Sequence, residues 1–198
     1  LRLWLTGTYL GFGLCAAVKR WRKRKYWYAA AATLLALVLA IWCNTLIYHT
    51  GNMNVTVLDV GQGESVALYS NGQAVLVDCG SANSYIDAGA VAADQLSAMG
   101  LHRLKAVLVT HFHADHTNGL YTLLTRMKAD TLYLPDMEDE YGVRERLLEL
   151  AERRGIQVVW VRRTTLTTVG NITVTLYPPV GEGDMNEQGL SVLGSAND

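Results

Sequence analysis

Four side chains that commonly bind metals lie within six residues of one another, directly after the apolar residues 105–110. They are His111, His113, Asp115 and His116. Residues two apart on an extended segment point to the same side, so His111 and His113 are placed to hold one ion, while Asp115 and His116 can address a second position close by. Imidazole nitrogens together with a carboxylate suit Zn, Mn or Fe. Because packing alone does not explain this spacing, it indicates a divalent metal site.

The chemistry expected of such a site is hydrolysis. A protein-held divalent ion lowers the pKa of bound water toward about 7, which makes a nucleophile available at neutral pH. Two ions about 3.5–4 Å apart can clamp a phosphoryl or carbonyl oxygen between them. The spacing of the histidines therefore predicts a metal-dependent hydrolase with two divalent ions, Zn or Mn.

Two further aspartates, Asp59 and Asp78, each end an apolar segment. A buried carboxylate is costly unless it is hydrogen-bonded or lies near a cation. In one interpretation each aspartate orients a metal-binding histidine through the second nitrogen of the ring. In the other interpretation each aspartate caps a turn, and the residues alone do not decide between the two.

The elements that position these side chains alternate between strands and helices after residue 50. Alternating β-branched segments predict strands, and apolar spacings of three and four residues that end at Gly100 or Gly155 predict helices. The expected strands are residues 54–60, 65–69, 73–77, 105–110, 131–134, 156–161, 172–177 and a last one that begins at Leu190. The expected helices are residues 84–99, 119–127 and 140–154. A hairpin followed by βα units predicts an α/β or α+β layer fold with helices on a face of a mixed sheet.

The first 50 residues differ in composition from the rest of the chain. They contain seven Lys or Arg and no acid, whereas residues 51–198 contain ten Lys or Arg and all 18 Asp and Glu, a net charge of about −8. Residues 28–47 carry no charge, and these 20 residues are long enough to cross a hydrocarbon core of about 30 Å. We expect a transmembrane helix over residues 28–48, with a buried helix of a soluble domain as the alternative.

The uncharged residues 3–18 are expected to be part of another span or, alternatively, an interfacial segment. A basic run such as residues 19–25 (KRWRKRK) is one form of nucleic-acid patch. Its place between two apolar segments favours a cytoplasmic loop under the positive-inside rule. These expectations divide the chain into a membrane segment, residues 1–50, and a domain on the outer face, residues 51–198.

Three motifs within residues 57–120 resemble the ComEC-type family of competence proteins. Residues 57–65 (VLDVGQGES) resemble the "LDVGQGDS" opening of that family's metallo-β-lactamase domain, residues 76–80 (LVDCG) resemble its "LIDTG", and residues 107–120 resemble its "VLTHPHADHIGGL". The motifs occur in the same order. The uncharged segment and basic loop before them are similar to the junction between the membrane domain and the hydrolase domain of that family, so the resemblance covers about residues 1–198.

The resemblance implies an α/β fold of metallo-β-lactamase-like αββα layers, incomplete at the C-terminus and preceded by transmembrane helices. The metal ligands that it implies are His111, His113, Asp115 and His116, and the catalytic residues are Asp115 and Asp78. The residues that it implies beside the site, lining it or orienting its ligands, are Asp59, Gln62, Asp78 and Asn186.

The function implied by the resemblance is a nuclease or phosphodiesterase that uses divalent ions to degrade the DNA strand that is not taken up. The expected partners are single-stranded DNA, the membrane and other proteins of the competence machinery. The expected location is the inner or plasma membrane of a bacterium, in a multi-pass protein whose hydrolase domain lies on the outer face.

The chain departs from the family pattern at several positions. Glu64, Cys79 and Phe112 replace the usual Asp, Thr and Pro, and none of these changes removes a ligand. Residues 186–190 (NEQGL) resemble the family's "NENSL", and Asn186 is the candidate for a position that a histidine occupies in many relatives outside this family. No histidine follows His116 and no "TGD" strand end occurs, so we expect the chain to be an incomplete hydrolase that is inactive alone.

Two other functions stay open on the sequence. A fold of this kind hosts many chemistries, so the chain could be a membrane-anchored hydrolase of another ester, lactone or phosphate. It could also be a non-catalytic membrane component whose site binds metal or DNA without turnover. The acidic balance after residue 50 counts against a DNA-binding surface. The residues that could still build a local basic groove are Arg103, Arg126, Lys128, Arg162 and Arg163.

Overall fold

The computed structural model describes residues 7, 9, 23–49, 51–180 and 188–197 of the chain. It divides into two compact units, Leu1–Ile47 and Tyr48–Asp198. Asn186, which the sequence suggests as a site residue, lies outside the described residues, as do most of the predicted partial span 3–18 and of the predicted basic loop 19–25.

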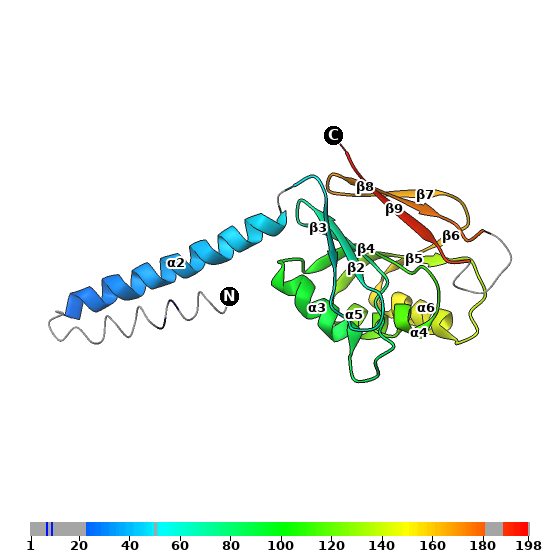
Figure 1. The fold of residues 1–198 in the computed structure, drawn as a ribbon, viewed down its shortest axis with the longest axis horizontal. Helices are drawn as coiled ribbons and strands as arrows, with labels where there is room; N and C mark the ends of the chain where they lie inside the picture. Colours follow the sequence, from blue (N-terminus) through cyan, green and yellow to red (C-terminus); the bar gives the residue numbers. More distant parts are fainter. Residues whose placement is uncertain (1–6, 8, 10–22, 50, 181–187, 198) are drawn as a thin grey trace. The chain divides into compact units, whose positions relative to one another are not determined.

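The helix α2, Lys23–His49, contains the uncharged segment for which the sequence predicts a transmembrane helix (Figure 1). Several of its large apolar side chains are exposed, among them Leu34, Leu35 and Trp42. Within the described part of the chain, however, no helix combines the length and apolar character needed to cross a membrane. The predicted transmembrane helix over residues 28–48 is therefore not confirmed.

The second unit is built on two sheets. The larger sheet has six strands in the order β1-β2-β3-β4-β5-β6, and the smaller has three in the order β7-β8-β9. The strands are β1 Asn54–Val57, β2 Val66–Ser70, β3 Gln73–Val77, β4 Arg103–Leu108, β5 Lys128–Pro135, β6 Gln157–Val161, β7 Thr165–Val169, β8 Ile172–Tyr177 and β9 Ser191–Ala196. Strands β1 to β3 pair antiparallel and β3 to β6 pair parallel, which makes the larger sheet mixed as predicted.

The helices of this unit are α3 Ala88–Ala98, α4 Ala114–Thr117, α5 Leu120–Arg126 and α6 Val143–Arg154. They cover one face of the larger sheet, and the smaller sheet covers the other (Figure 1). The predicted mixed α/β fold is thus confirmed. Residues 51–180 and 188–197 form three layers in the order helices, larger sheet, smaller sheet. The second helical layer of the expected αββα arrangement, on the outer side of the smaller sheet, is not present among these residues.

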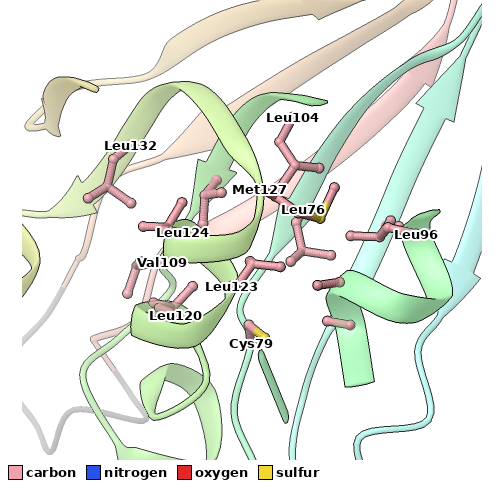
Figure 2. Packing of buried hydrophobic residues seen from close by; sticks show 14 of the residues in the cluster. Leu76, Cys79, Leu96, Leu104, Val109, Leu120, Leu123, Leu124, Met127 and Leu132 are labelled. Atoms are coloured by element: carbon pink, nitrogen blue, oxygen red, sulfur yellow. The ribbon is translucent and has the colours of Figure 1, made fainter. Parts of the chain in front are cut away.

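The core explains why β3 and β4 are almost entirely apolar. Alternate residues of a strand face opposite sides of the sheet, and both sides are covered here. Leu76 and Val107 pack toward the helices, whereas Val77 and Leu108 pack toward the smaller sheet. Figure 2 shows the helical side, where Leu120, Leu123 and Leu124 of α5 are completely buried with Leu76, Leu96 and Leu132. Each such side chain contributes about 1.5–3 kcal/mol on burial.

Several observed elements differ from the sequence prediction in their bounds: β5 begins at Lys128 and not at residue 131, and the helix predicted from residue 84 begins at Ala88. Two strands differ for reasons that the structure shows. Strand β1 ends at Val57, not at residue 60, because the backbone turns so that Leu58 donates to the Ser65 carbonyl at 2.8 Å and Val60 to the Leu58 carbonyl at 2.9 Å. Strand β7 was not predicted. Its sequence TLTTV is rich in polar threonine, and it becomes a strand by pairing with β8.

Candidate active site

The candidate site is built where three separate loops meet at the carboxyl ends of β3 and β4. Backbone hydrogen bonds join them directly. The N–H of Glu64 donates to the carbonyl of Asp115 at 3.0 Å, the N–H of Gly80 to the carbonyl of Glu64 at 3.1 Å, and the N–H of Cys79 to the carbonyl of His116 at 2.8 Å. The three sequence motifs, far apart along the chain, thus form one interlocked unit.

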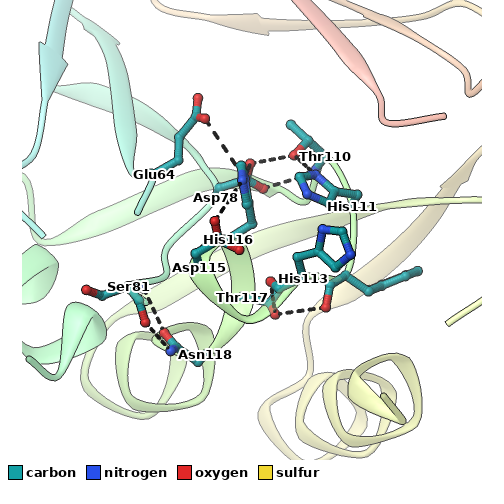
Figure 3. A network of polar contacts seen from close by, with 11 residues as sticks. Glu64, Asp78, Ser81, Thr110, His111, His113, Asp115, His116, Thr117 and Asn118 are labelled. Carbon is teal, nitrogen blue, oxygen red and sulfur yellow. Dashed lines mark hydrogen bonds and ion pairs between the residues drawn. The ribbon is translucent and has the colours of Figure 1, made fainter. Parts of the chain in front are cut away.

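This close approach requires glycine at position 80. A Cβ atom there would lie 2.5 Å from the backbone nitrogen of His116 and 2.6 Å from the carbonyl oxygen of Ala114. A further clamp fixes the same helix, because Asn118 accepts from the N–H of Ser81 at 3.0 Å and donates to its carbonyl at 2.6 Å (Figure 3). The backbone of α4 is therefore held rigidly against the end of β3.

The structure brings the four predicted metal ligands together. The ring centroids of His111 and His116 are 4.0 Å apart, and those of His111 and His113 are 4.9 Å apart (Figure 3). His113 is extended, with φ −64° and ψ 150°, and is the N-cap of α4. Helix α4 begins at Ala114, earlier than the sequence suggested, so Asp115 and His116 lie within its single turn. The half-exposed Asp115 places Oδ2 3.8 Å from Nε2 of His116.

Asp78 orients His116 from behind the cluster. The carboxylate is completely buried, and Oδ1 accepts from the N–H of Thr110 at 2.8 Å. Oδ2 accepts from the Thr110 hydroxyl at 2.5 Å and from Nδ1 of His116 at 2.8 Å. An ionised carboxylate only accepts, so Nδ1 of His116 carries a proton, and in the neutral ring Nε2 keeps its lone pair for a ligand.

Asp78 is also held in an uncommon backbone conformation. Its φ is +55°, a left-handed value that aspartate tolerates better than most residues. The backbone N–H of Asp78 donates to the Leu108 carbonyl at 2.9 Å, and Ser65 donates to the Asp78 carbonyl at 3.2 Å. Surrounding contacts therefore maintain a conformation that aims the carboxylate at His116 and Thr110.

Burial and neighbouring charges shift the pKa values of His111 and His116 in opposite directions. Burial lowers the pKa of His111, and the adjacent His116 lowers it further. Burial alone would also lower the pKa of His116, but its hydrogen bond to Asp78 and the charges of Asp78, Asp115 and Glu64 outweigh that effect and raise the pKa. His111 is thus kept neutral at ordinary pH, the state in which imidazole binds metal.

The donor set of this cluster fits a divalent metal. Nδ1 of His111 lies 3.0 Å from the Thr110 hydroxyl, whereas Nε2 is buried and is the one such side-chain atom in the described part of the chain without a hydrogen-bond partner. Leaving a buried polar atom unsatisfied costs about 1–3 kcal/mol. A metal ion beside three imidazoles and a carboxylate would satisfy it, and the ligands would be His111, His113, Asp115 and His116.

A second grouping of possible ligand atoms involves Glu64, Asp78 and His116, which lie within 4.8 Å of one another. We favour the histidine-rich set because both Asp78 oxygens already accept hydrogen bonds, and Nδ1 of His116 is the donor to one of them. Glu64 is exposed and its Oε2 lies 3.9 Å from the same Nδ1. Glu64 therefore adds negative charge at the rim.

Two further predicted residues, Asp59 and Gln62, have hydrogen bonds to residues outside the histidine cluster. Asp59 is exposed, and its backbone exchanges two hydrogen bonds of 3.3 Å with the side chain of Gln95, so the interpretation that its carboxylate orients a histidine stays a prediction. The exposed Gln62 accepts from the N–H of Ala82 at 2.5 Å, which fixes the loop beside the site. Sequence reasoning missed Thr110, although a hydroxyl between a buried strand and the first histidine was a usable signal.

The basic groove considered from the sequence is largely neutralised. Arg103 pairs with Asp130, Arg126 with Asp94 at 2.5 Å, and Arg162 with Asp136 at 2.9 Å. These three cations are therefore matched by neighbouring acids on the surface, and they do not supply the excess positive charge that attracts a phosphate backbone.

The fold and the cluster together define a protein of mixed α/β fold with a candidate metal site, and the family follows from comparison. Residues 58–186 match the Metallo-beta-lactamase superfamily, so the chain belongs to that superfamily. Its members bind divalent metals, often Zn, and are typically metal-dependent hydrolases. No curated protein matches the chain.

Several solved structures share the fold at low sequence identity. YhfI from Bacillus subtilis, a metallo-beta-lactamase fold protein, is 18% identical with a TM-score of 0.52, over 72% of this chain and 58% of that chain. The Rm3 metallo-beta-lactamase is 19% identical with a TM-score of 0.51, over 78% and 60%. MEM-A1, a subclass B3 metallo-beta-lactamase from a soil metagenome library, is 18% identical with a TM-score of 0.52, over 73% and 55%. The chain thus spans less than two thirds of these structures, and the likeness concerns the fold alone.

Proposed function

We propose that this chain belongs to a divalent-metal phosphodiesterase that cleaves single-stranded DNA in a ComEC-type DNA-uptake protein. The observation that carries the hydrolase part is the unsatisfied, buried Nε2 of His111 beside two further imidazoles and Asp115. The nuclease part is supported by the motifs at residues 57–65, 76–80 and 107–120, which resemble that family.

The roles of the residues follow from their surroundings. His111 and His113 would hold one ion, and Asp115 with Nε2 of His116 would hold a second. Asp78 keeps the proton of His116 on Nδ1, and Thr110 fixes both Asp78 and His111. Divalent ions held there, Zn or Mn, would polarise a phosphoryl oxygen and make water nucleophilic at neutral pH.

The test is hydrolysis by the full-length protein that contains this chain, with Zn or Mn added. We expect cleavage of single-stranded DNA and of bis-p-nitrophenyl phosphate, and loss of both in His113→Ala. His102→Ala is the matched control because His102 is an exposed histidine at the start of β4, outside the cluster. Equal activity in His113→Ala and His102→Ala would refute the hydrolase proposal, and turnover of a lactone or carboxylic ester without DNA cleavage would refute the nuclease part.

Attachment to the inner or plasma membrane of a bacterium, with the site on the outer face, is a separate part of the proposal. It is supported by the uncharged residues 28–47 and the exposed apolar side chains of α2, although the described helix falls short of a spanning one. Protease added to intact spheroplasts should degrade the residues after α2. Contacts with other proteins of the competence machinery are also part of the proposal. Recovery of the full-length protein in the supernatant after lysis would refute the attachment.

A further inference from the structure

A cleft of about 540 Å³ opens beside the histidine cluster, lined by residues of α4, α5, α6 and the loop before α6. Its volume is typical of small-molecule sites, which measure about 300–1,000 Å³. His113 and Asp115 lie on its wall, so anything bound in the cleft would sit next to the proposed metal site.

The cleft combines an apolar floor with exposed aromatic walls. Phe112 and Leu147 on its lining are buried, with exposed fractions of 0% and 3%. Tyr121 and Tyr141, also on the lining, are instead 51% and 56% exposed. Exposed rings beside an apolar floor offer flat surfaces on which another ring can stack.

Two hydrogen bonds hold the backbone at Tyr141 in the structure without a ligand. Its N–H donates to Oδ1 of Asp139 at 2.9 Å, and the other carboxylate oxygen of Asp139 accepts from the N–H of Arg144 at 2.6 Å. The Tyr141 ring lies 5.9 Å from the ring of His113, centroid to centroid, at 57°. The side chain therefore presents its ring at the edge of the cluster without a loop rearrangement.

The cleft also offers a cation to a phosphate group. Its lining contains Arg146 together with Asp115 of the proposed metal site, and one guanidinium nitrogen of Arg146 donates to the Tyr141 carbonyl at 3.4 Å. The guanidinium is exposed and carries further N–H groups that can contact a phosphate oxygen. A ring surface and a cation thus lie side by side next to the site of cleavage.

We infer that the cleft binds the base of the nucleotide next to the scissile phosphate, stacked on Tyr141, while Arg146 contacts the following phosphate. This inference rests on the proposed phosphodiesterase function and specifies how its substrate is recognised. Stacking on an aromatic ring tolerates every base, because every base has a π-face. The cleft therefore predicts single-stranded nucleic acid bound with little sequence preference.

The experiment measures binding separately from hydrolysis. The full chain in EDTA is titrated into fluorescein-labelled pentathymidylate and into a matched abasic pentamer, and anisotropy is recorded at several salt concentrations. We expect the wild-type chain to prefer pentathymidylate, Tyr141→Ala to lose about 5- to 150-fold in affinity for it, and Tyr141→Phe to keep its affinity. Binding of the abasic pentamer should be equal in all three. Tyr177→Ala is the control, since Tyr177 is an exposed tyrosine on β8 that does not line the cleft.

Arg146 is tested through the salt dependence. Loss of one phosphate contact should reduce the slope of log affinity against log salt by about 0.7 in Arg146→Gln, and not in Arg153→Gln, an exposed arginine of the same helix outside the cleft. Equal affinity of the wild-type chain for both pentamers, or an unchanged affinity in Tyr141→Ala, would overturn the inference. Because no metal is present, these outcomes do not depend on whether the protein proves to be a hydrolase.

Discussion

Nδ1 of His116 lies 2.8 Å from Oδ2 of Asp78, a completely buried carboxylate one residue beyond β3. The contact joins the end of β3 to α4, the short helix that carries Asp115 and His116, two of the four proposed metal ligands. It fixes the tautomer of His116, and it gives the buried carboxylate the partner that makes its burial tolerable. Positioning of the ligand and stability of the fold therefore depend on the same hydrogen bond.

Replacing Asp78 by Asn should lower the pKa of His116 in the metal-free chain. Burial favours the neutral ring, and the Asp78 carboxylate, by hydrogen bond and charge, is a main reason that the pKa lies above its ordinary value. The amide keeps a similar shape but removes the charge. The pKa is measured from the pH dependence of the histidine ring signals by NMR. Zn affinity should fall by about 10- to 100-fold, as for other partners of metal-bound histidines.

Asp94→Asn is the control for that prediction, because Asp94 pairs with Arg126 on the surface. It should leave the pKa of His116 and the Zn affinity unchanged. A pKa of His116 that stays raised in Asp78→Asn would contradict the role given to this carboxylate.

Replacing Gly80 by Ala should destabilise the fold and weaken metal binding together. The added Cβ would meet the backbone of α4 at Ala114, Asp115 and His116, and backbone atoms cannot rotate away. Forcing an extra methyl group into such a contact costs about 1–3 kcal/mol. Urea unfolding gives the loss of stability, and calorimetric titration with Zn gives the loss of affinity.

Gly155→Ala separates the two effects. Gly155 ends α6 with φ +66°, and a Cβ there would meet no atom within 4 Å, so its substitution strains only the backbone. It should cost stability, about 1 kcal/mol, and leave Zn affinity unchanged. If Gly80→Ala behaved in the same way, the close approach at residue 80 would not matter for the site.

Much of the fold could be predicted because its signals are local. The apolar run before His111, the Asn71-Gly72 turn and the glycine after α6 each indicate their element without knowledge of the rest. Strand β7 lacked such a signal, since its sequence TLTTV is mostly threonine and becomes a strand by pairing with β8. The end of β1 at Val57 depends on a turn that closes against Ser65.

The site was predictable in its residue types but not in its contacts. The spacing of His111, His113 and His116 predicts that their imidazole rings lie close together. The hydrogen bond between Asp78 and His116 instead depends on how two loops far apart in the sequence meet in the fold. Asp59 and Asp78 look alike in the sequence, each ending an apolar segment, and only the fold separates the exposed one from the buried one. Tyr141 gave no signal, because its ring contact with His113 arises from the position that the loop before α6 takes in the fold.

Removing metal should lower the thermal stability of the full-length protein. A ligand that binds only the folded state at 100 times its Kd stabilises it by about 2.7 kcal/mol, and a chelator reverses this gain. His111→Ala should abolish the effect, because it removes the buried Nε2 that has no other partner among the described residues. Differential scanning calorimetry with Zn and with EDTA measures it. His102→Ala should retain the full Zn effect, and an equal loss in both variants would point to nonspecific binding.

The Cys79 thiol should be inert in the folded chain. It is completely buried, and burial is the main reason that its pKa rises to about 12, with the charges of Asp87 and Asp78 adding to the rise against a hydrogen bond from Ser65. Since the thiolate is the reactive form, an alkylating reagent at pH 8 should modify Cys79 only after unfolding. Alkylation of Cys79 after unfolding in urea is the positive control, read by mass spectrometry of the peptides.

The same raised pKa predicts how stability changes at alkaline pH. Below the ordinary thiol pKa of 9.0 both the folded and the unfolded chain hold the proton, so the buried thiol has no effect on the pH dependence. Above it the unfolded chain releases the proton while the folded chain retains it, so the free energy of unfolding falls as the pH rises toward about 12. Between pH 9 and 10 the wild-type chain should lose about 1 kcal/mol more than Cys79→Ala. Parallel urea-unfolding curves for the two proteins over this range would show that Cys79 ionises normally in the folded state.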